Sequence, residues 1–194
     1  MRLPARMREY HLPSFCLHTR RILYIGKATA GAFRPESHET AFDGPTRFWS
    51  FAREISRIAD PKCSDLSNLA WSNIFKQGVL VRNPDGDMAR AQKSTSVAEL
   101  RGEVEELRPT IIVCENAGSN EDVIKSAFDI TDGLLTEQNP QGLEQVLVSG
   151  EKSDLWYRPQ YANWPPLFWM YHPQGKSKAY TNAAIGLVQS RMKW

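Results

Sequence analysis

The chain has 194 residues and a formal net charge of +2, with 41% hydrophobic and 24% charged residues. This composition is typical of a globular protein and excludes collagen, a coiled coil and extensive disorder, and a chain of this length buries a core without disulfide or metal cross-links. No apolar run reaches the roughly 18 to 20 residues of a membrane span, and the first residues lack the apolar region of a secretory signal. We therefore expect a cytoplasmic protein with a single domain over residues 1–194, in which residues 1–20 are a basic N-terminal segment.

The first half of the chain mixes a short apolar run with one strongly periodic helix. The segments are, in chain order, a buried strand over 21–26, a polar loop over 27–44, a helix from Pro45 to Asp60, an irregular stretch or short helix over 61–72, a short strand over 79–81 and a turn over 83–87.

The second half alternates apolar runs with helical patterns. The segments are, in chain order, a helix over 94–107, a strand over 110–114, a helix after Ser119, a strand over 145–149, a loop over 150–166, a strand over 167–171, a tight loop over 172–177 and a final helix over 177–192. Apolar strands that alternate with helices favour an α/β fold. We expect a single-domain three-layer α/β/α arrangement around a mostly parallel sheet of four to five strands.

Three polar segments follow predicted strands or buried segments. They begin after Gly26, around Asn73 and at His172. In open parallel sheets, ligands bind beyond the carboxyl ends of the strands, so these three segments are the candidates for a functional site.

Charge is uneven along the chain. Residues 1–27 contain six basic residues and one acid, and residues 155–194 contain five basic residues and no acid. The second of these segments also holds nine of the 20 aromatic residues. If both ends meet in the fold, they form one basic face with interleaved aromatic side chains, which suits a nucleic acid. The alternative interpretation is that the charged residues are scattered over the solvated surface and the aromatic residues belong to the core.

Common catalytic and cofactor templates fit poorly. The run Gly175-Lys176-Ser177 lies between a strand and a helix, but a phosphate-binding P-loop needs glycine at the position of Met170. The weaker inference remains that amides at this helix start, with Lys176, hold a phosphate. The sequence contains no serine-hydrolase elbow, no dinucleotide fingerprint and no histidine or cysteine spacing typical of a metal site. We expect no cofactor, no metal or metal cluster, and reduced cysteines.

The order of these pieces resembles the uracil-DNA glycosylase superfamily. The segments that carry the resemblance are Ile22–Gly31, Trp71–Lys76, Leu107–Glu115 and Tyr171–Ser177. The resemblance implies a DNA glycosylase that hydrolyses the N-glycosidic bond of uracil, or of another damaged or modified base, flipped out of DNA. It implies single- or double-stranded DNA as the partner and no membrane.

The resemblance also implies roles for individual residues. His172 would donate a hydrogen bond to the departing base, and Asn73 would read the base edge with its amide. The remaining candidates are Gly26, Ala28 and Phe33 around the base, Lys27 and Glu36 in catalysis, and Gln174, Lys176 and Ser177 on the DNA backbone.

The chain departs from the family pattern in its first motif. Lys27, Ala28 and Thr29 stand where many members place an acid or asparagine, and Gln174 replaces the usual serine after His172-Pro173. Lys27 could form a covalent sugar adduct, orient a phosphate or be exposed, and nearby acids such as Glu36 could activate water. Two other functions stay open: a non-catalytic nucleic-acid binder on the same fold, and a nucleotide-handling enzyme that uses Lys176.

Overall fold

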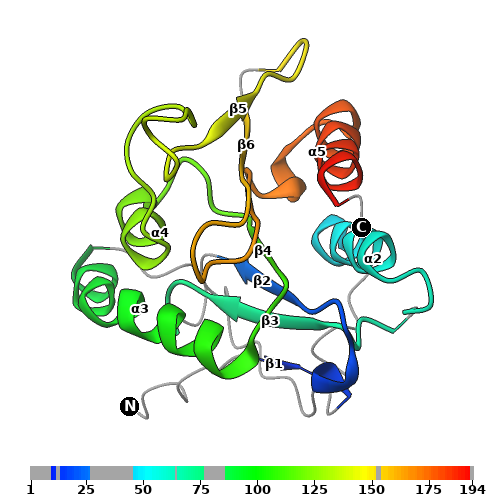
Figure 1. The fold of residues 1–194 in the computed structure, drawn as a ribbon, viewed down its shortest axis with the longest axis horizontal. Coiled ribbons are helices and arrows are strands. Elements are labelled where there is room, and N and C mark those ends of the chain that lie inside the picture. The colour runs from blue at the N-terminus through cyan, green and yellow to red at the C-terminus, as the bar shows by residue number, and fades with distance from the viewer. Residues whose placement is uncertain are drawn as a thin grey trace.

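The structure is a computed structural model, and it describes residues 10–11, 14–26, 46–63, 65–76, 86–151 and 154–192. In this part of the chain, strands and helices alternate around one sheet (Figure 1). The strands are β1 (Tyr10–His11), β2 (Ile22–Gly26), β3 (Leu69–Asn73), β4 (Ile111–Cys114), β5 (Glu144–Val146), β6 (Leu155–Arg158) and β7 (Leu167–Trp169). The α-helices are α2 (Arg47–Ala59), α3 (Gly86–Leu107), α4 (Glu121–Ala127) and α5 (Lys178–Arg191), and the 3-10 helices are η1 (Phe15–Leu17) and η2 (Pro173–Gly175).

The strands form a seven-stranded sheet in the order β1-β3-β2-β4-β7-β6-β5. Strands β3, β2, β4 and β7 are mutually parallel, whereas β1 on one side and β6 and β5 on the other each pair antiparallel with the preceding strand of the sheet. The predicted α/β class with a parallel core is confirmed. The sheet is wider than the four to five strands expected, because short antiparallel strands extend the core at both edges.

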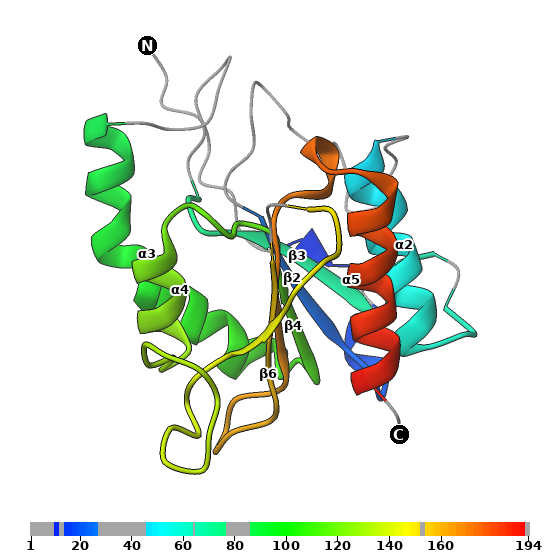
Figure 2. The ribbon, with the colours of Figure 1, turned by 90° about the horizontal axis from the view of Figure 1, so that it is seen from above.

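Helices cover both faces of the sheet, which gives the predicted three layers (Figure 2). Helices α2 and α5 pack on one face, over a buried cluster that includes Tyr24, Val113 and Phe168. Helices α3 and α4 pack on the other face, over a cluster that includes Leu23 and Ile112. Neighbouring residues of one strand belong to opposite clusters, as the two-residue period of a β-strand requires. Among the helices described, none combines the length and the apolar composition needed to span a membrane.

Three segment predictions are wrong. Residues 69–73 form strand β3 inside a stretch expected to be irregular, and residues 155–158 form strand β6 inside a predicted loop. Helix α3 begins at Gly86, eight residues before the predicted start, so part of the predicted turn over 83–87 is helical. The strand expected over 79–81 lies outside the described residues.

Leu23 and Leu147 offer a matched test of the central packing. Leu23 is fully buried in β2, whereas Leu147 is 76% exposed. We expect Leu23→Ala to lower the free energy of unfolding by about 2–5 kcal/mol, because it removes buried methyl groups and leaves a cavity. Leu147→Ala should change it by less than about 0.5 kcal/mol. Urea unfolding followed by circular dichroism measures both, and equal losses would contradict the buried position of β2.

Candidate functional site

The carboxyl ends of the four parallel strands lie level with one another. Gly26 ends β2 directly beside Asn73, which ends β3. On the other side of β2, the backbone N–H of Glu115, the first residue after β4, donates to Ile25 O at 2.9 Å. Beyond β7, the N–H of Met170 donates to Cys114 O at 2.9 Å, and Tyr171 and His172 follow. Segments far apart in the sequence therefore meet at one edge of the sheet.

The pleat of the strands places these residues on the same face of the sheet. Trp71, Tyr24 and Val113 belong to the cluster beneath α2 and α5. Asn73, Gly26 and Glu115 each follow one of these residues by two positions, so they project to that same face. Met170 belongs to the same cluster, and it leads into the loop that carries His172. We call the group of Asn73, Gly26, Glu115 and His172 the edge site.

Gly26 leaves a gap in the edge site that its neighbour fills. A Cβ at position 26 would lie 2.6 Å from Oδ1 of Asn73, a separation at which something must shift. Asn73 is 2% exposed, so its carboxamide has little room to move away. Position 26 requires glycine because the Asn73 amide lies over the end of β2, where a side chain at position 26 would collide with it.

Buried contacts on the opposite face hold the end of β3. The Lys76 ammonium pairs with the Glu103 carboxylate of α3, and Ser72 Oγ donates to Glu103 Oε2 at 2.7 Å. Nearby, Ser96 Oγ donates to Ile74 O at 2.8 Å. These contacts on either side of Asn73 fix the backbone from which its amide projects. The sequence analysis missed this network, although a lysine three residues after Asn73 in an apolar stretch was an available signal.

Helix α2 joins the His172 loop through Phe48. The rings of Phe48 and His172 stack with centroids 5.3 Å apart and planes 17° apart. Phe48 also meets Tyr24 edge-on at 5.1 Å and Trp71 at 6.1 Å. In addition, Arg47 Nη1 donates to Lys176 O at 3.0 Å. The sequence predicts Phe48 only as a core residue of the helix. In the structure its ring contacts Tyr24 and Trp71 of the central strands as well as His172 of the loop.

His172 has a defined tautomer in its neutral form. Its Nδ1 accepts a hydrogen bond from the backbone N–H of Gln174 at 3.2 Å. Partial burial lowers the pKa of the imidazole below its usual value, so the ring is neutral at pH 7. Since Nδ1 is the acceptor, the single ring proton is on Nε2, which leaves His172 with a hydrogen-bond donor on its far side.

Glu115 is a buried carboxyl group that the sequence analysis did not propose as a site residue. It is 1% exposed, and its Oε1 accepts a hydrogen bond from the Tyr24 hydroxyl. Its Oε2 has no hydrogen-bond partner among the described residues. Burial raises the pKa of this carboxyl well above its usual range, and the Tyr24 hydrogen bond opposes that rise. Burial therefore favours the protonated form of this carboxyl over the ionised form. No local pattern distinguishes it from a surface glutamate.

The residues expected to contact DNA are part of the loop that begins at His172. Ser177 caps α5, accepting from the Tyr180 N–H at 3.1 Å, and its hydroxyl also contacts Glu151. The Lys176 ammonium lies 4.2 Å from the ring centroid of Tyr171. Gln174 is exposed. The other predicted site residues, Lys27, Ala28, Phe33 and Glu36, lie outside the described residues.

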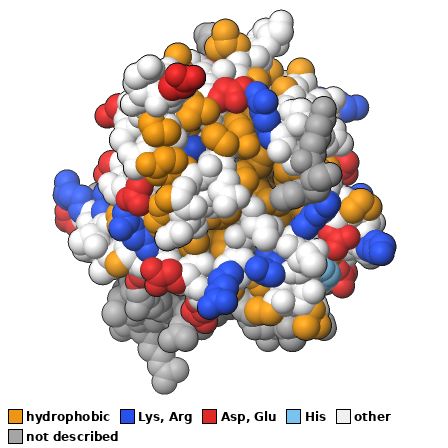
Figure 3. Space-filling model, viewed as in Figure 1, with side chains coloured by type: hydrophobic (Ala, Val, Ile, Leu, Met, Phe, Trp, Pro, Cys, Tyr) orange, Lys and Arg blue, Asp and Glu red, His pale blue; other side chains and the backbone are white. Residues whose placement is uncertain are grey.

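Four of the six basic residues of segment 1–27 lie outside the described residues, so the basic face stays a prediction, and several of the described charges have partners within the fold. Arg21 lies at the amino end of β2 and binds the backbone oxygens of His18 and Arg108. Arg158 is fully buried, and Arg191 pairs with Glu144. On the face that Figure 3 shows, basic and acidic side chains are interspersed around the rim. Arg21, Arg158 and Arg191, which contribute to the charge of the two basic segments, therefore bind groups within the fold.

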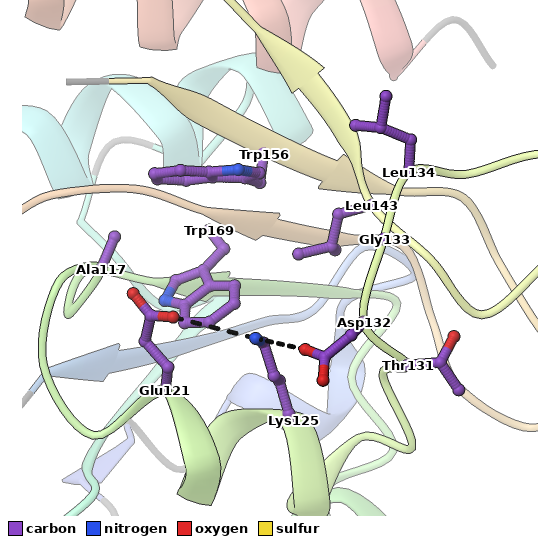
Figure 4. A pocket seen from close by; sticks show the side chains of 10 residues that line it. All are labelled: Ala117, Glu121, Lys125, Thr131, Asp132, Gly133, Leu134, Leu143, Trp156 and Trp169. Atoms are coloured by element: carbon purple, nitrogen blue, oxygen red, sulfur yellow. Dashed lines mark hydrogen bonds and ion pairs between the residues drawn. The ribbon is translucent and has the colours of Figure 1, made fainter. Parts of the chain in front are cut away.

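A cavity lies on the opposite face of the sheet from the edge site. Its volume is about 240 Å³, and Figure 4 shows that Lys125 lies between two carboxylates at its rim. The Lys125 ammonium is 2.8 Å from Asp132 and 3.8 Å from Glu121. These charges largely satisfy one another, and the cavity contains no histidine. The residues that define it are Trp156, Trp169, Leu143, Glu121, Lys125 and Asp132. The edge site is therefore the stronger candidate for catalysis.

Comparison with known proteins assigns neither site. No family model matches the chain, and a search of curated proteins finds no match. Among the described residues, no group of three or more His, Cys, Asp or Glu side chains is placed to hold a metal ion. The functional argument therefore depends on the geometry of the edge site and on the resemblance of its segments.

The raised pKa of Glu115 predicts a dependence of stability on pH. Its folded-state pKa is raised, so folding stabilises the protonated form, and this contribution declines as the pH rises above the ordinary pKa of a glutamate. We expect the free energy of unfolding of the wild type to fall by about 1 kcal/mol per pH unit from this group in that window. Glu115→Gln keeps the shape and removes the titration.

Urea unfolding between pH 5 and pH 8 measures this difference, with Glu106→Gln, an exposed change of the same kind on α3, as the control. The control should keep the wild-type slope and Glu115→Gln should flatten it. Identical slopes in all three proteins would mean that Glu115 is ionised in the folded state.

Proposed function

We propose that the protein is a DNA glycosylase that hydrolyses the N-glycosidic bond of uracil, or of another damaged or modified base, after the nucleotide has flipped out of DNA. The observation that carries the proposal is the edge site itself. A buried carboxamide, Asn73, and a neutral imidazole with an Nε2–H donor, His172, project at one edge and on one face of a parallel core. The order of these segments in the sequence matches that of the superfamily they resemble.

The chemistry of base excision requires such groups. A base inside a duplex is inaccessible, so it must enter a pocket where its edge is recognised. The Asn73 amide offers one donor and one acceptor to the Watson–Crick edge of the base. Gly26 lets this amide lie over the end of β2, and Phe48 and Trp71 belong to the buried cluster on the same face of the sheet.

His172 acts on the bond that breaks. As the bond between sugar and base stretches, the sugar becomes oxocarbenium-like and negative charge builds up on the departing base. A preorganised donor aimed at the atom that gains this charge lowers the barrier. The Nε2–H of neutral His172 is such a donor, and the Phe48 stack and the Gln174 N–H fix the ring. The catalytic role of Lys27, as an amine that forms a sugar adduct or orients a phosphate, and that of Glu36, in the activation of water, stay predictions.

The DNA backbone would lie along the beginning of α5. This helix of 14 residues presents its N-terminus next to Lys176, and Arg47 of α2 is joined to the same loop. A helix N-terminus and nearby cations bind phosphate oxygens without reading sequence. The proposal keeps the cytoplasmic location that the sequence predicts.

Loss of the His172 donor tests the proposed chemistry directly. We expect His172→Ala to lower the single-turnover rate of base release by about 100- to 1000-fold, the usual effect of removing one such donor. The assay uses duplexes that carry uracil, hypoxanthine or modified cytosines, followed by alkaline cleavage of the abasic sites. The control is His18→Ala, which removes a histidine bound to Ser67 near the amino end of β2.

The control variant should release bases at the wild-type rate. Wild-type rates for His172→Ala on every accepted base would exclude the proposed role. Salt-sensitive DNA binding by the wild type without any base release would instead favour a non-catalytic nucleic-acid binder.

The gap at Gly26 gives a second test of the site. In Gly26→Ala, the new methyl group would displace the Asn73 carboxamide, so base release should fall at least tenfold while the protein stays folded. Gly102→Ala, in α3 with no atom close to the added methyl group, is the matched control. It should keep full activity and gain about 0.5–1 kcal/mol of stability. Unchanged release by Gly26→Ala would show that the Asn73 amide is not needed where it lies.

A further inference from the structure

The cavity on the α3 and α4 face of the sheet has an apolar wall and a charged wall. Figure 4 shows Trp156 and Trp169 on one side of it and a lysine between two carboxylates on the other. The two indole rings have centroids 6.0 Å apart, and Nε1–H of Trp169 donates to Oδ1 of Asn116 at 2.9 Å. At about 240 Å³ the cavity is smaller than the roughly 300–1,000 Å³ of sites for drug-sized ligands, so it suits one long side chain.

The charged wall has one more carboxylate than it has ammonium groups. The Lys125 ammonium lies 2.8 Å from Asp132 and 3.8 Å from Glu121, and the described residues supply neither carboxylate with another cation. Glu121 and Asp132 are 49% and 90% exposed, so a second cation can reach them from solvent. The partly exposed ring of Trp156 lies across the cavity, and an indole ring attracts cations as well. The cavity therefore favours an ammonium or guanidinium group and disfavours a phosphate.

The segment around the cavity extends this negative charge. Residues 119–151 contain seven acidic residues and one basic residue, Lys125. Three of the seven acids pair with cations of α3 or α5, and the other four include the two at the cavity. An excess of one charge attracts a partner of the opposite charge from a distance and orients it as it approaches. The partner expected at this segment is therefore basic.

Strand β5 has an open edge next to the cavity, because it is the last strand of the described sheet. Leu143, just before β5, donates its N–H to Gly133 O at 3.3 Å and accepts from the Leu135 N–H at 3.0 Å. Successive residues of an antiparallel strand direct their backbone groups alternately to the two sides, so those of Gln145 also point to the outer edge. No described strand pairs with β5 on that side. Such an edge accepts an extended peptide as an additional strand.

Exposed leucines lie close to this edge and to the cavity. Leu134, at the rim of the cavity, is 59% exposed, and Leu147, the residue after β5, is 76% exposed. Among the large hydrophobic side chains of the described residues, only Leu17 is similarly exposed. Apolar groups rimmed by charged ones are typical of a protein-binding surface, and these leucines offer contacts to the side chains of an added strand.

We propose that the cavity and the outer edge of β5 form a docking surface for an extended basic segment of a partner protein. The segment adds a strand beside β5, and one of its lysine or arginine side chains enters the cavity between Trp156 and the carboxylates of Glu121 and Asp132. The surface lies on the face of the sheet opposite the edge site, so the inference does not depend on the proposed glycosylase function.

The experiment is a titration of the whole chain with short synthetic peptides, followed through the ¹⁵N–¹H indole signal of Trp156. The probe is an acetylated, amidated peptide of alternating valine and lysine, which is basic and favours an extended conformation. We expect a saturable shift of the Trp156 signal that weakens as salt is added. A valine–glutamate peptide tests the charge, and a proline–lysine peptide tests the strand, because proline lacks the N–H that pairing requires. Both should bind at least about tenfold more weakly than the probe.

A variant that combines Glu121→Gln with Asp132→Asn removes both carboxylates of the charged wall and keeps their shape. It should weaken binding of the valine–lysine peptide by about five- to tenfold. Glu137→Gln is the matched control, because Glu137 is an exposed acid of the same segment that does not line the cavity. It should weaken binding by less than about twofold.

The absence of any Trp156 shift, or an equal shift with the valine–glutamate peptide, would overturn the inference. Equal affinity for the proline–lysine peptide or for free cadaverine would also overturn it, since the surface would then bind an amine without adding a strand. Equal losses in the double variant and in Glu137→Gln would show that the cation does not enter the cavity. Each of these outcomes leaves the base-release tests of the edge site unaffected.

Discussion

The register of the four central parallel strands is the constraint on which the site depends. Because β3, β2 and β4 end at the same level, Asn73, Gly26 and Glu115 lie in one row. Because the side chains of a strand alternate between faces, all three face α2 and α5. A slip of one residue would turn each of them to the opposite face, toward α3 and α4. The chemistry of the edge site is therefore set by backbone pairing, and no single loop defines it.

Packing on both faces of the sheet makes this row rigid. On one face, Phe48 contacts His172, Tyr24 and Trp71, so the histidine loop and the strand ends move together. On the other face, Lys76 and Glu103 form a buried ion pair, which is useful for fixing a geometry even where it adds little net stability. The site thus combines aromatic contacts that position the imidazole with polar contacts that position the end of β3.

The sequence predicts the layers and the recurring strand–helix order because those depend on local periodicity. It misses β3, since Leu69-Ala70-Trp71-Ser72-Asn73 mixes small and polar residues, and in the fold its burial comes from two neighbouring strands. It also counts Arg158 in the charge of the basic segment 155–194, and only the fold reveals that this side chain is fully buried against Phe128 O.

Part of the edge site was predictable from the sequence, because the ends of the predicted strands depend on local sequence patterns. The positions of Asn73 and His172 after strands follow from the pattern. Glu115 could not be found in this way, because its burial, which raises its pKa, comes from elements distant in the sequence, and its partner Tyr24 is adjacent to it only in the sheet.

Binding of a flipped base at the edge site is tested most directly by indole resonances in a ¹⁵N–¹H spectrum. The probe is a duplex that carries a 2′-fluoroarabino-hypoxanthine nucleotide, which resists hydrolysis, and single Trp→Phe variants assign the signals. Trp71 lies at the edge site, and Trp156 lines the cavity on the other face. The account predicts that the Trp71 signal shifts on titration and that the Trp156 signal does not. A shift confined to Trp156 would contradict it.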